Sequence, residues 1–226
     1  MVAGTTTTAD SFAALRNDKQ EGRHPVSDEL IQIVNAAQAS AVSRSVQHLA
    51  CRPGCSQCCY GVFEISALDA ARLREGLAEA QPDVAGRVRK RVQEARAKLG
   101  PFYPGDLSTG LLTGTEEEIE LFEEWAHAEP CPVLDPETQT CDLYAHRPIL
   151  CRTFGPPILN DPEDRDAGVA ICELCFTEAT EDEIVAAEMD SSFRPLQERA
   201  EAEYEANNPG SGPTIVAFAF GAKDDN

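Results

Sequence analysis

The chain has 226 residues, 42% of them hydrophobic but only 6% aromatic, so it is long enough for one sizeable core built mainly from aliphatic side chains. Its 39 acidic and 19 basic residues give a formal charge of −20 at pH 7, which argues against nucleic acid as a partner because phosphate binding needs a basic surface. No apolar stretch approaches the ~18 residues of a membrane span and no secretory signal is visible, so we expect a cytoplasmic protein with no membrane partner.

The first part of the chain is expected to be helical after a flexible leader. Residues 1–27 form this leader, with a short helix around residues 12–15. Apolar side chains then recur at helical spacing over residues 28–49, and Ser27 is the expected N-cap. Pro and Gly in residues 51–54 end the pattern, because both residue types favour a loop.

Further helices are expected on both sides of a loop around residue 100. Residues 61–66 predict a short strand, followed by helices from Ser66 to Ala80 and from Asp83 to Leu99. Thr115 is the expected cap of a strongly acidic helix over 116–128, whose acids are most simply its solvated face. The expected buried face of that helix consists of Ile119, Phe122, Trp125 and Ala126.

The second half of the chain carries fewer helical signals. Residues 130–176 are rich in Pro and Gly and hold five of the nine cysteines, whereas an acidic helical region follows at 180–206. The C-terminal tail, 207–226, contains one candidate strand at 214–220. The sequence therefore predicts a mainly α protein with small irregular β elements, in which residues 28–206 form a single helical domain and cysteine-rich loops converge on a metal site.

The cysteines gather in loops between the expected helices. They are Cys51, Cys55, Cys58 and Cys59, then Cys131, Cys141 and Cys151, and finally Cys172 and Cys175. We interpret all nine as metal ligands, because a tetrahedral ion needs sulfurs at about 2.3 Å that converge from several directions, and tight turns can aim them. Ordinary buried thiols would fall on helix faces, and an odd number of cysteines in a reducing compartment argues against a disulfide framework.

The cysteine spacing leaves several alternatives open. The adjacent side chains of Cys58 and Cys59 diverge, so they bind different ions or different corners of a cluster, unless one of them is a small buried hydrophobe. Nine sulfurs are enough for two four-cysteine sites with one left over, but the sequence does not assign the partition. The spacing of Cys51, Cys55 and Cys58 also occurs in radical S-adenosylmethionine enzymes, although no alternation of strands and helices is visible here.

Two longer motifs carry a family resemblance. CRPGCSQCC at 51–59, and CPVLD at 131–135 followed by CDLYAHRPILCRTFG at 141–155, resemble the signatures of the YkgJ-type cysteine-cluster proteins, which are zinc- or iron-chelating domains. The resemblance covers about 51–176, although many family members have two residues, not three, between the first two cysteines. It implies a metal ion as partner, with zinc or iron as the cofactor and a [4Fe–4S] cluster as one form of the iron. A related domain in flagellin lysine methylases implies the alternative of an iron–sulfur redox protein or enzyme.

The residues around the sulfurs suggest how the charge of a metal site would be balanced. Four thiolates on Zn²⁺ leave a charge of about −2, so such a site needs nearby positive charge. Arg147 and Arg152 are expected to lie just outside the sulfurs and to donate hydrogen bonds to them. His146 is an alternative ligand, Tyr144 is expected to pack with its hydroxyl hydrogen-bonded, and Asp135 is expected to make a turn.

No other chemistry is suggested by the sequence. Nothing resembles a catalytic Ser-His-Asp set, a phosphate loop or a dinucleotide fingerprint. The sequence therefore predicts a metal-chelating protein and leaves open whether the metal only holds loops together, carries electrons or binds substrate in an enzyme, or is passed to another protein.

Overall fold

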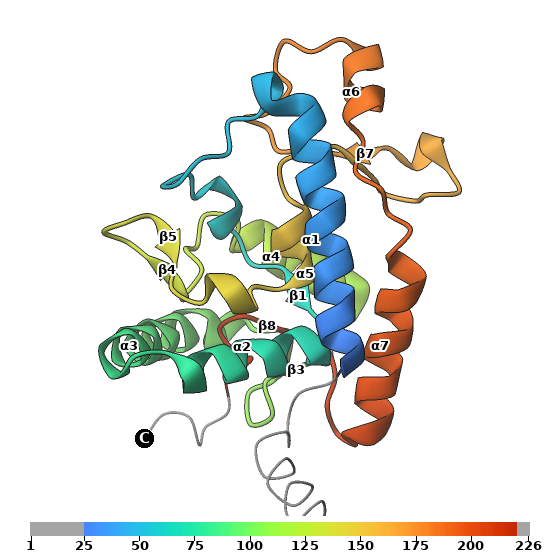
Figure 1. Cartoon of the computed structure of the whole chain (residues 1–226). Helices are drawn as coiled ribbons and strands as arrows, with labels where there is room; N and C mark the ends of the chain where they lie inside the picture. The colour runs from blue at the N-terminus through green and yellow to red at the C-terminus, as the bar shows by residue number, and fades with distance from the viewer. Residues whose placement is uncertain (1–24, 221–226) are drawn as a thin grey trace, which may run out of the picture.

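The structure, a computed structural model of the chain, describes residues 25–220, and helices make up most of this part (Figure 1). The helices are α1 (Pro25–Ser45), α2 (Ala67–Glu79), α3 (Pro82–Leu99), α4 (Glu116–Trp125), α5 (Ile149–Thr153), α6 (Glu181–Ala187) and α7 (Arg194–Asn207), with short 3₁₀ turns η2 (Val46–His48), η3 (Gln57–Cys59), η4 (Gly100–Phe102), η5 (Tyr144–His146) and η6 (Arg165–Ala167). Antiparallel strands pair as β1 (Glu64–Ile65) with β8 (Thr214–Ile215), β2 (Gly105–Asp106) with β3 (Leu111–Leu112), β4 (Leu134–Asp135) with β5 (Thr140–Cys141), and β6 (Ile158–Leu159) with β7 (Val169–Ala170). The predicted fold class is confirmed. The division into leader, single domain and tail stays a prediction, because most of residues 1–27 and the helix expected at 12–15 lie outside the described range.

No helix within residues 25–220 is long and apolar enough to cross a membrane. The longest, α1, buries one side in the protein: Leu30, Val34 and Ala41 are fully buried, and the helix packs against α5, α6 and α7 (Figure 1). Spacing by three to four residues, or by seven, places such side chains on one helix face, as the sequence predicts.

The prediction that Ser27 caps the first helix is wrong. The helix already begins at Pro25, whose fixed backbone angle suits the first helical turn. Ser27 is buried inside this turn, and its hydroxyl accepts a hydrogen bond of 2.8 Å from Arg72 Nη1 of α2. The serine therefore joins two helices.

The helices α2 and α3 form a second part of the core with the end of the chain. Ser66 caps α2 as predicted, since its hydroxyl accepts the Asp69 N–H at 3.2 Å. Leu73 of α2 and Val88 of α3 are fully buried in a cluster that also contains Phe220. The strand expected over 214–220 is confirmed only for its first two residues, after which the chain turns and buries its side chains.

The acidic helix α4 differs from the prediction at its C-terminal end. Thr115 and Glu118 form a reciprocal capping box, which confirms the predicted start. The helix ends at Trp125, earlier than expected, and the Trp125 ring is 45% exposed although it was placed on the buried face. Its ring lies 4.4 Å from that of Phe102 in η4, because it projects beside the core while Phe122 enters it.

The acidic region predicted as helical over 180–206 is two helices, α6 and α7, with a break between them. In this break the Met189 N–H donates to the carbonyl of Pro157 at 2.7 Å. Met189 and Phe193 are buried in the cluster that contains the apolar face of α1. The break therefore lets two apolar side chains reach the core, which one continuous helix would not allow.

Candidate metal centre

The cysteine-bearing loops of residues 51–59 and 131–175 meet in space, as the sequence predicts. All nine cysteines are free thiols. Electrostatic interactions join the Cys51 thiol to that of Cys175 and the Cys58 thiol to that of Cys131. In Figure 1 the chain that follows α1 runs from the α6 end of the molecule down to the β4–β5 hairpin, so it passes both regions.

Four of the thiols interact with one another around the β4–β5 hairpin, and we call them the inner thiol group. They are Cys58, Cys131, Cys141 and Cys151, from η3, the two arms of the hairpin and α5. The backbone fixes this arrangement: the Cys131 N–H donates to the Cys59 carbonyl at 2.7 Å, and the Leu134 N–H donates to the Cys131 carbonyl at 2.9 Å. Leu134 is in turn the cross-strand partner of Cys141.

The other four interacting thiols lie beyond the C-terminal end of α1, and we call them the outer thiol group. They are Cys51, Cys55, Cys172 and Cys175. The Ala50 N–H points at the Cys175 sulfur at 3.4 Å, and the Phe176 N–H donates to the His48 carbonyl at 2.8 Å. Gly155 has φ +112°, and a Cβ there would lie 3.0 Å from the Cys51 sulfur, so a glycine lets the chain after α5 approach this thiol.

The thiols raise one another's pKa within each group. The pKa of Cys131 is raised to about 12, first by burial and then by Cys141 and Cys58. The pKa of Cys51 is also raised to about 12, by burial and by Cys175, Cys172 and Cys55. Without metal, Cys51 and Cys131 are therefore protonated at neutral pH, and a bound metal has to displace their protons.

Cys59 stands apart from both groups. Its thiol interacts with that of Cys58, and its carbonyl accepts from the Cys131 N–H. As the side chains stand, no three His, Cys, Asp or Glu residues of the described range are grouped closely enough to hold an ion. A cysteine sulfur moves by rotation about a single torsion angle, so the thiols of a group can turn to a common point while the backbone stays in place.

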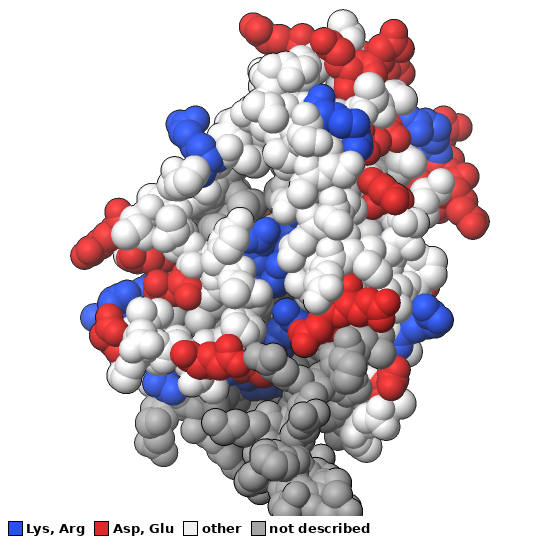
Figure 2. All heavy atoms as spheres, in the orientation of Figure 1, with Lys and Arg blue, Asp and Glu red and all other residues white. Residues whose placement is uncertain are grey.

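The buried charge beside the inner thiol group is positive. Among the buried side chains of the described residues, Arg72, Arg147 and Arg152 stand against a single carboxylate, Asp69. The surface has the opposite character: Figure 2 shows acidic side chains at the top and along both sides of this face, with fewer basic ones. Arg72 also pairs with Asp28 at 3.4 Å and Arg152 donates to two carbonyls, so Arg147 is the buried arginine whose charge calls for a further anion.

Among the buried arginines, Arg147 has the most direct electrostatic effect on the inner thiol group. Its charge lowers the pKa of Cys58 and Cys141, against the stronger effects that raise it. Its Nε and Nη1 are buried and have no hydrogen-bond partner among the described residues, and its Nη2 reaches only Gln38 Oε1 at 3.5 Å. The unused donors suit thiolate sulfurs that carry the negative charge of a metal site.

Arg152 is connected differently. Its Nε donates to the Arg147 carbonyl at 3.0 Å, its Nη2 to the Ala145 carbonyl at 2.6 Å and its Nη1 to Asn35 Oδ1 at 3.0 Å. Burial and the neighbouring arginines lower its pKa to about 10, so it stays charged at neutral pH. These bonds hold the chain before α5 against α1, while a direct role of Arg152 beside the sulfurs stays a prediction.

Three further sequence predictions for this region have different outcomes. Asp135 makes the turn as expected, accepting from Glu137 N–H at 3.1 Å. Tyr144 is not packed: it is 63% exposed, and its ring lies 3.8 Å from the Arg147 guanidinium carbon, which it covers from outside. The ring of His146 lies 3.4 Å from a Glu79 carboxylate oxygen, and its role as an alternative ligand stays a prediction.

Two residues that position the inner thiol group were missed by the sequence reasoning. The Asp69 carboxylate of α2 accepts the Ile149 N–H at 3.2 Å with each oxygen and so caps α5, which carries Cys151. Arg91 of α3 donates to the Pro132 carbonyl at 2.8 Å and so holds the hairpin. Both lie on helices that the sequence predicts. A charged residue on a helix is normally expected at the surface, so no local signal distinguishes these two residues from ordinary surface residues.

Replacing Asp69 by alanine is expected to lower the free energy of unfolding by about 1–3 kcal/mol, because the buried Ile149 N–H loses its acceptor. Burial raises the pKa of Asp69 from 3.8 to about 7. Its contribution to stability is therefore full below about pH 4 and is lost as the pH rises through 7. Asp69→Asn keeps an acceptor but does not titrate, so denaturant unfolding should show the wild type losing stability relative to it between pH 5 and pH 8. A constant difference across that range would contradict the expectation.

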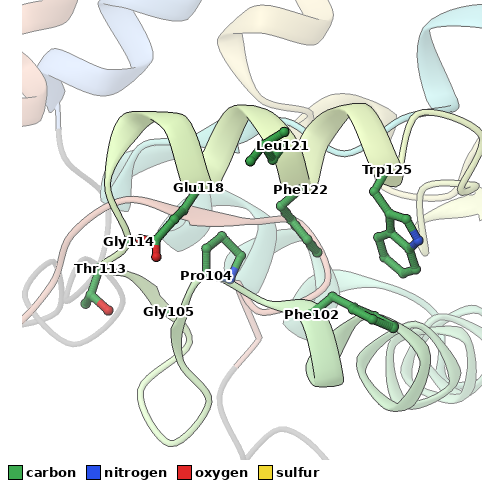
Figure 3. Close-up of a pocket in the computed structure, with 9 residues that line it drawn as sticks. All are labelled: Phe102, Pro104, Gly105, Thr113, Gly114, Glu118, Leu121, Phe122 and Trp125. Atoms are coloured by element: carbon green, nitrogen blue, oxygen red, sulfur yellow. The ribbon is translucent and has the colours of Figure 1, made fainter.

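A groove of about 580 Å³ lies on another part of the protein, under α4. Figure 3 shows Phe122 and Trp125 of α4 facing Phe102 and Pro104 across it, with Glu118 at one end. None of its lining residues is a cysteine. The groove is therefore not part of the candidate metal centre.

One comparison with known proteins gives a match. A family model for the CxxCxxCC domain, described as a "Putative zinc- or iron-chelating domain", matches residues 50–175, more than half of the 226-residue chain. No curated protein and no solved structure gives a significant match. The matched range includes all nine cysteines and the three residues Asp69, Arg91 and Arg147 that surround the inner thiol group.

Proposed function

Because the chain belongs to the CxxCxxCC family of zinc- or iron-chelating domains, we propose that it binds zinc or iron through thiolates drawn from its nine cysteines. The observation that carries this proposal is the buried positive charge: within residues 25–220, Nε and Nη1 of Arg147 have no partner, and its charge acts on thiols from two separate loops. Neutral thiols leave that charge uncompensated, whereas a metal bound by four thiolates supplies the missing negative charge.

The donor set fits both metals. Four thiolates suit tetrahedral Zn²⁺ and also a [4Fe–4S] cluster, and either leaves a net charge of about −2 on the site. A zinc ion would hold the loops together, whereas a cluster would add the ability to accept and donate an electron. We place the protein in the cytoplasm, where reducing conditions keep nine thiols free for metal.

Metal binding would also contribute to the stability of the fold. The cysteines of the β4–β5 hairpin are only half-buried, and the strands that carry them are two residues long. Val133, Leu134 and Leu143 anchor this segment in the core, but its two-residue strands supply few backbone hydrogen bonds. A ligand present at about 1,000 times its dissociation constant stabilises the folded state by about 4 kcal/mol, which such loops need.

The test is metal analysis of protein purified without oxygen. We expect zinc or iron at no less than one equivalent per chain, and a melting temperature that falls when a strong chelator removes it. A colourless protein with zinc supports a structural site, whereas a brown protein with equal amounts of iron and acid-labile sulfide supports the iron–sulfur alternative. A protein that is folded, metal-free and indifferent to added Zn²⁺ and Fe²⁺ would refute the proposal.

A further inference from the structure

Resting on the proposed metal binding, we propose that the cysteines build two separate four-thiolate sites, and that Cys59 belongs to neither. The inner thiol group forms one site and the outer thiol group forms the other. The sequence leaves this partition open, and the family description names no ligands. The contacts described above divide the thiols in this way: residues 51–59 supply Cys51 and Cys55 to the outer group and Cys58 to the inner group, and the rest of each group comes from a different part of the chain.

The boundary between the sites falls between Cys55 and Cys58. The two residues that separate these cysteines are tied to opposite sides. The Ser56 hydroxyl donates to Gln139 Oε1 at 2.5 Å, at the turn of the β4–β5 hairpin that carries inner thiols. The Gln57 amide donates to the carboxylate of Glu173, which lies between the two outer cysteines of the Cys172–Cys175 turn. The segment 55–58 therefore spans two centres instead of wrapping around one.

The thiol contacts follow the same division. Cys51 and Cys172 each interact with Cys175 and Cys55, which are outer thiols. Electrostatic interactions join Cys151 to Cys131, Cys141 and Cys58, all of which are inner thiols. The interactions that dominate in one group do not include a thiol of the other.

The same contacts leave Cys59 outside both sites. Its neighbour Cys58 interacts with the inner thiols Cys131, Cys141 and Cys151, and Cys59 is not among the main interactions of those three thiols. Cys59 interacts with the Cys58 thiol and is absent from the thiols that interact with Cys51 and Cys172, so we assign it to neither site. Cys59→Ser removes one sulfur that belongs to neither group, so it serves as the matched control.

The two sites differ in their surroundings. The inner site lies beside buried Arg147 and its four cysteines are half-buried, whereas the outer site combines buried Cys172 and Cys175 with Cys51, an exposed residue followed by the exposed residues 52–54. Access controls how readily a metal site is opened by competing ligands. We therefore expect the outer site to exchange its metal with solution and the inner site to retain it.

The experiment counts metal in chains that lack one pair of thiols. Wild type, Cys172→Ser/Cys175→Ser, Cys141→Ser/Cys151→Ser and Cys59→Ser are purified in the same way and their metal is measured per chain. We expect each pair variant to keep half of the wild-type metal and Cys59→Ser to keep all of it. Release of metal to a coloured chelator is followed in parallel. Wild type should release half of its metal in a fast phase, and only the outer-pair variant should lack this fast phase.

The outcomes separate the partition from metal binding itself. Loss of all metal from the outer-pair variant, with its circular dichroism unchanged, would show a single shared site and overturn the partition. So would loss of metal from Cys59→Ser. If the inner-pair variant does not fold, metal release from wild type still tests the partition. Two phases are expected from two different sites, and a single phase overturns the partition. A wild type without metal would instead refute the proposed function.

Discussion

Cys151→Ser is expected to reduce the metal content of the purified protein and to lower its melting temperature by roughly 10 °C. Binding of a structural zinc contributes about 10–16 kcal/mol in small domains, so one ligand of four accounts for roughly 3 kcal/mol. In a chain of this length, 1 kcal/mol corresponds to about 2–4 °C. Cys151 interacts with three other thiols of the inner thiol group, which is why its loss should open that site.

The comparison that isolates the metal is the same pair of proteins after the metal has been removed. If Cys151 acts through a metal, wild type and variant should melt at nearly the same temperature once a strong chelator is present. An ordinary packed thiol would give the same difference with and without chelator, since serine places a hydroxyl group in its site in both conditions. A difference that persists undiminished would remove Cys151 from the ligands.

The helices could be predicted from the sequence because each carries its signal locally. Thr115 and Glu118, three residues apart, form a capping box. The spacing of apolar residues in α1 predicts its buried face even when the elements that pack against it are unknown. Errors occurred where distant contacts override local preference. The hydroxyl of Ser27 bonds to Arg72 of another helix, and the acidic region after residue 180 breaks to bury Met189.

The candidate site shows the same limit. The cysteines and Arg147 could be singled out because cysteine spacing and a neighbouring Arg-Pro are visible in the sequence. Which thiols meet depends on where the β4–β5 hairpin and the Cys172–Cys175 turn lie in the fold. The spacing of cysteines along the chain does not determine those positions. Asp69 and Arg91 act on the loops from helices 40 or more residues away in the chain, so their roles follow only from the structure.

Arg147→Met is expected to change the stability of the metal-bound and metal-free protein in opposite directions. Methionine fills a similar volume without charge. In the metal-bound protein the variant loses the cation that balances the thiolates, and loss of such an outer partner typically weakens metal affinity about 10–100-fold. In the metal-free protein it removes a buried charge whose Nε and Nη1 have no partner among the described residues, so stability should be unchanged or higher.

Competition against a zinc-binding dye measures the affinity, and thermal melting with and without chelator measures both stabilities. Arg147→Lys keeps the charge but not the planar donors, so its affinity should fall between those of wild type and Arg147→Met. Arg199→Met, at an exposed position of α7, serves as the matched control and should change neither quantity. If Arg147 only packs the loop against Tyr144, the methionine variant should be less stable in both states. A loss of stability in the metal-free protein as large as in the metal-bound protein would therefore show that Arg147 does not balance the charge of a metal site.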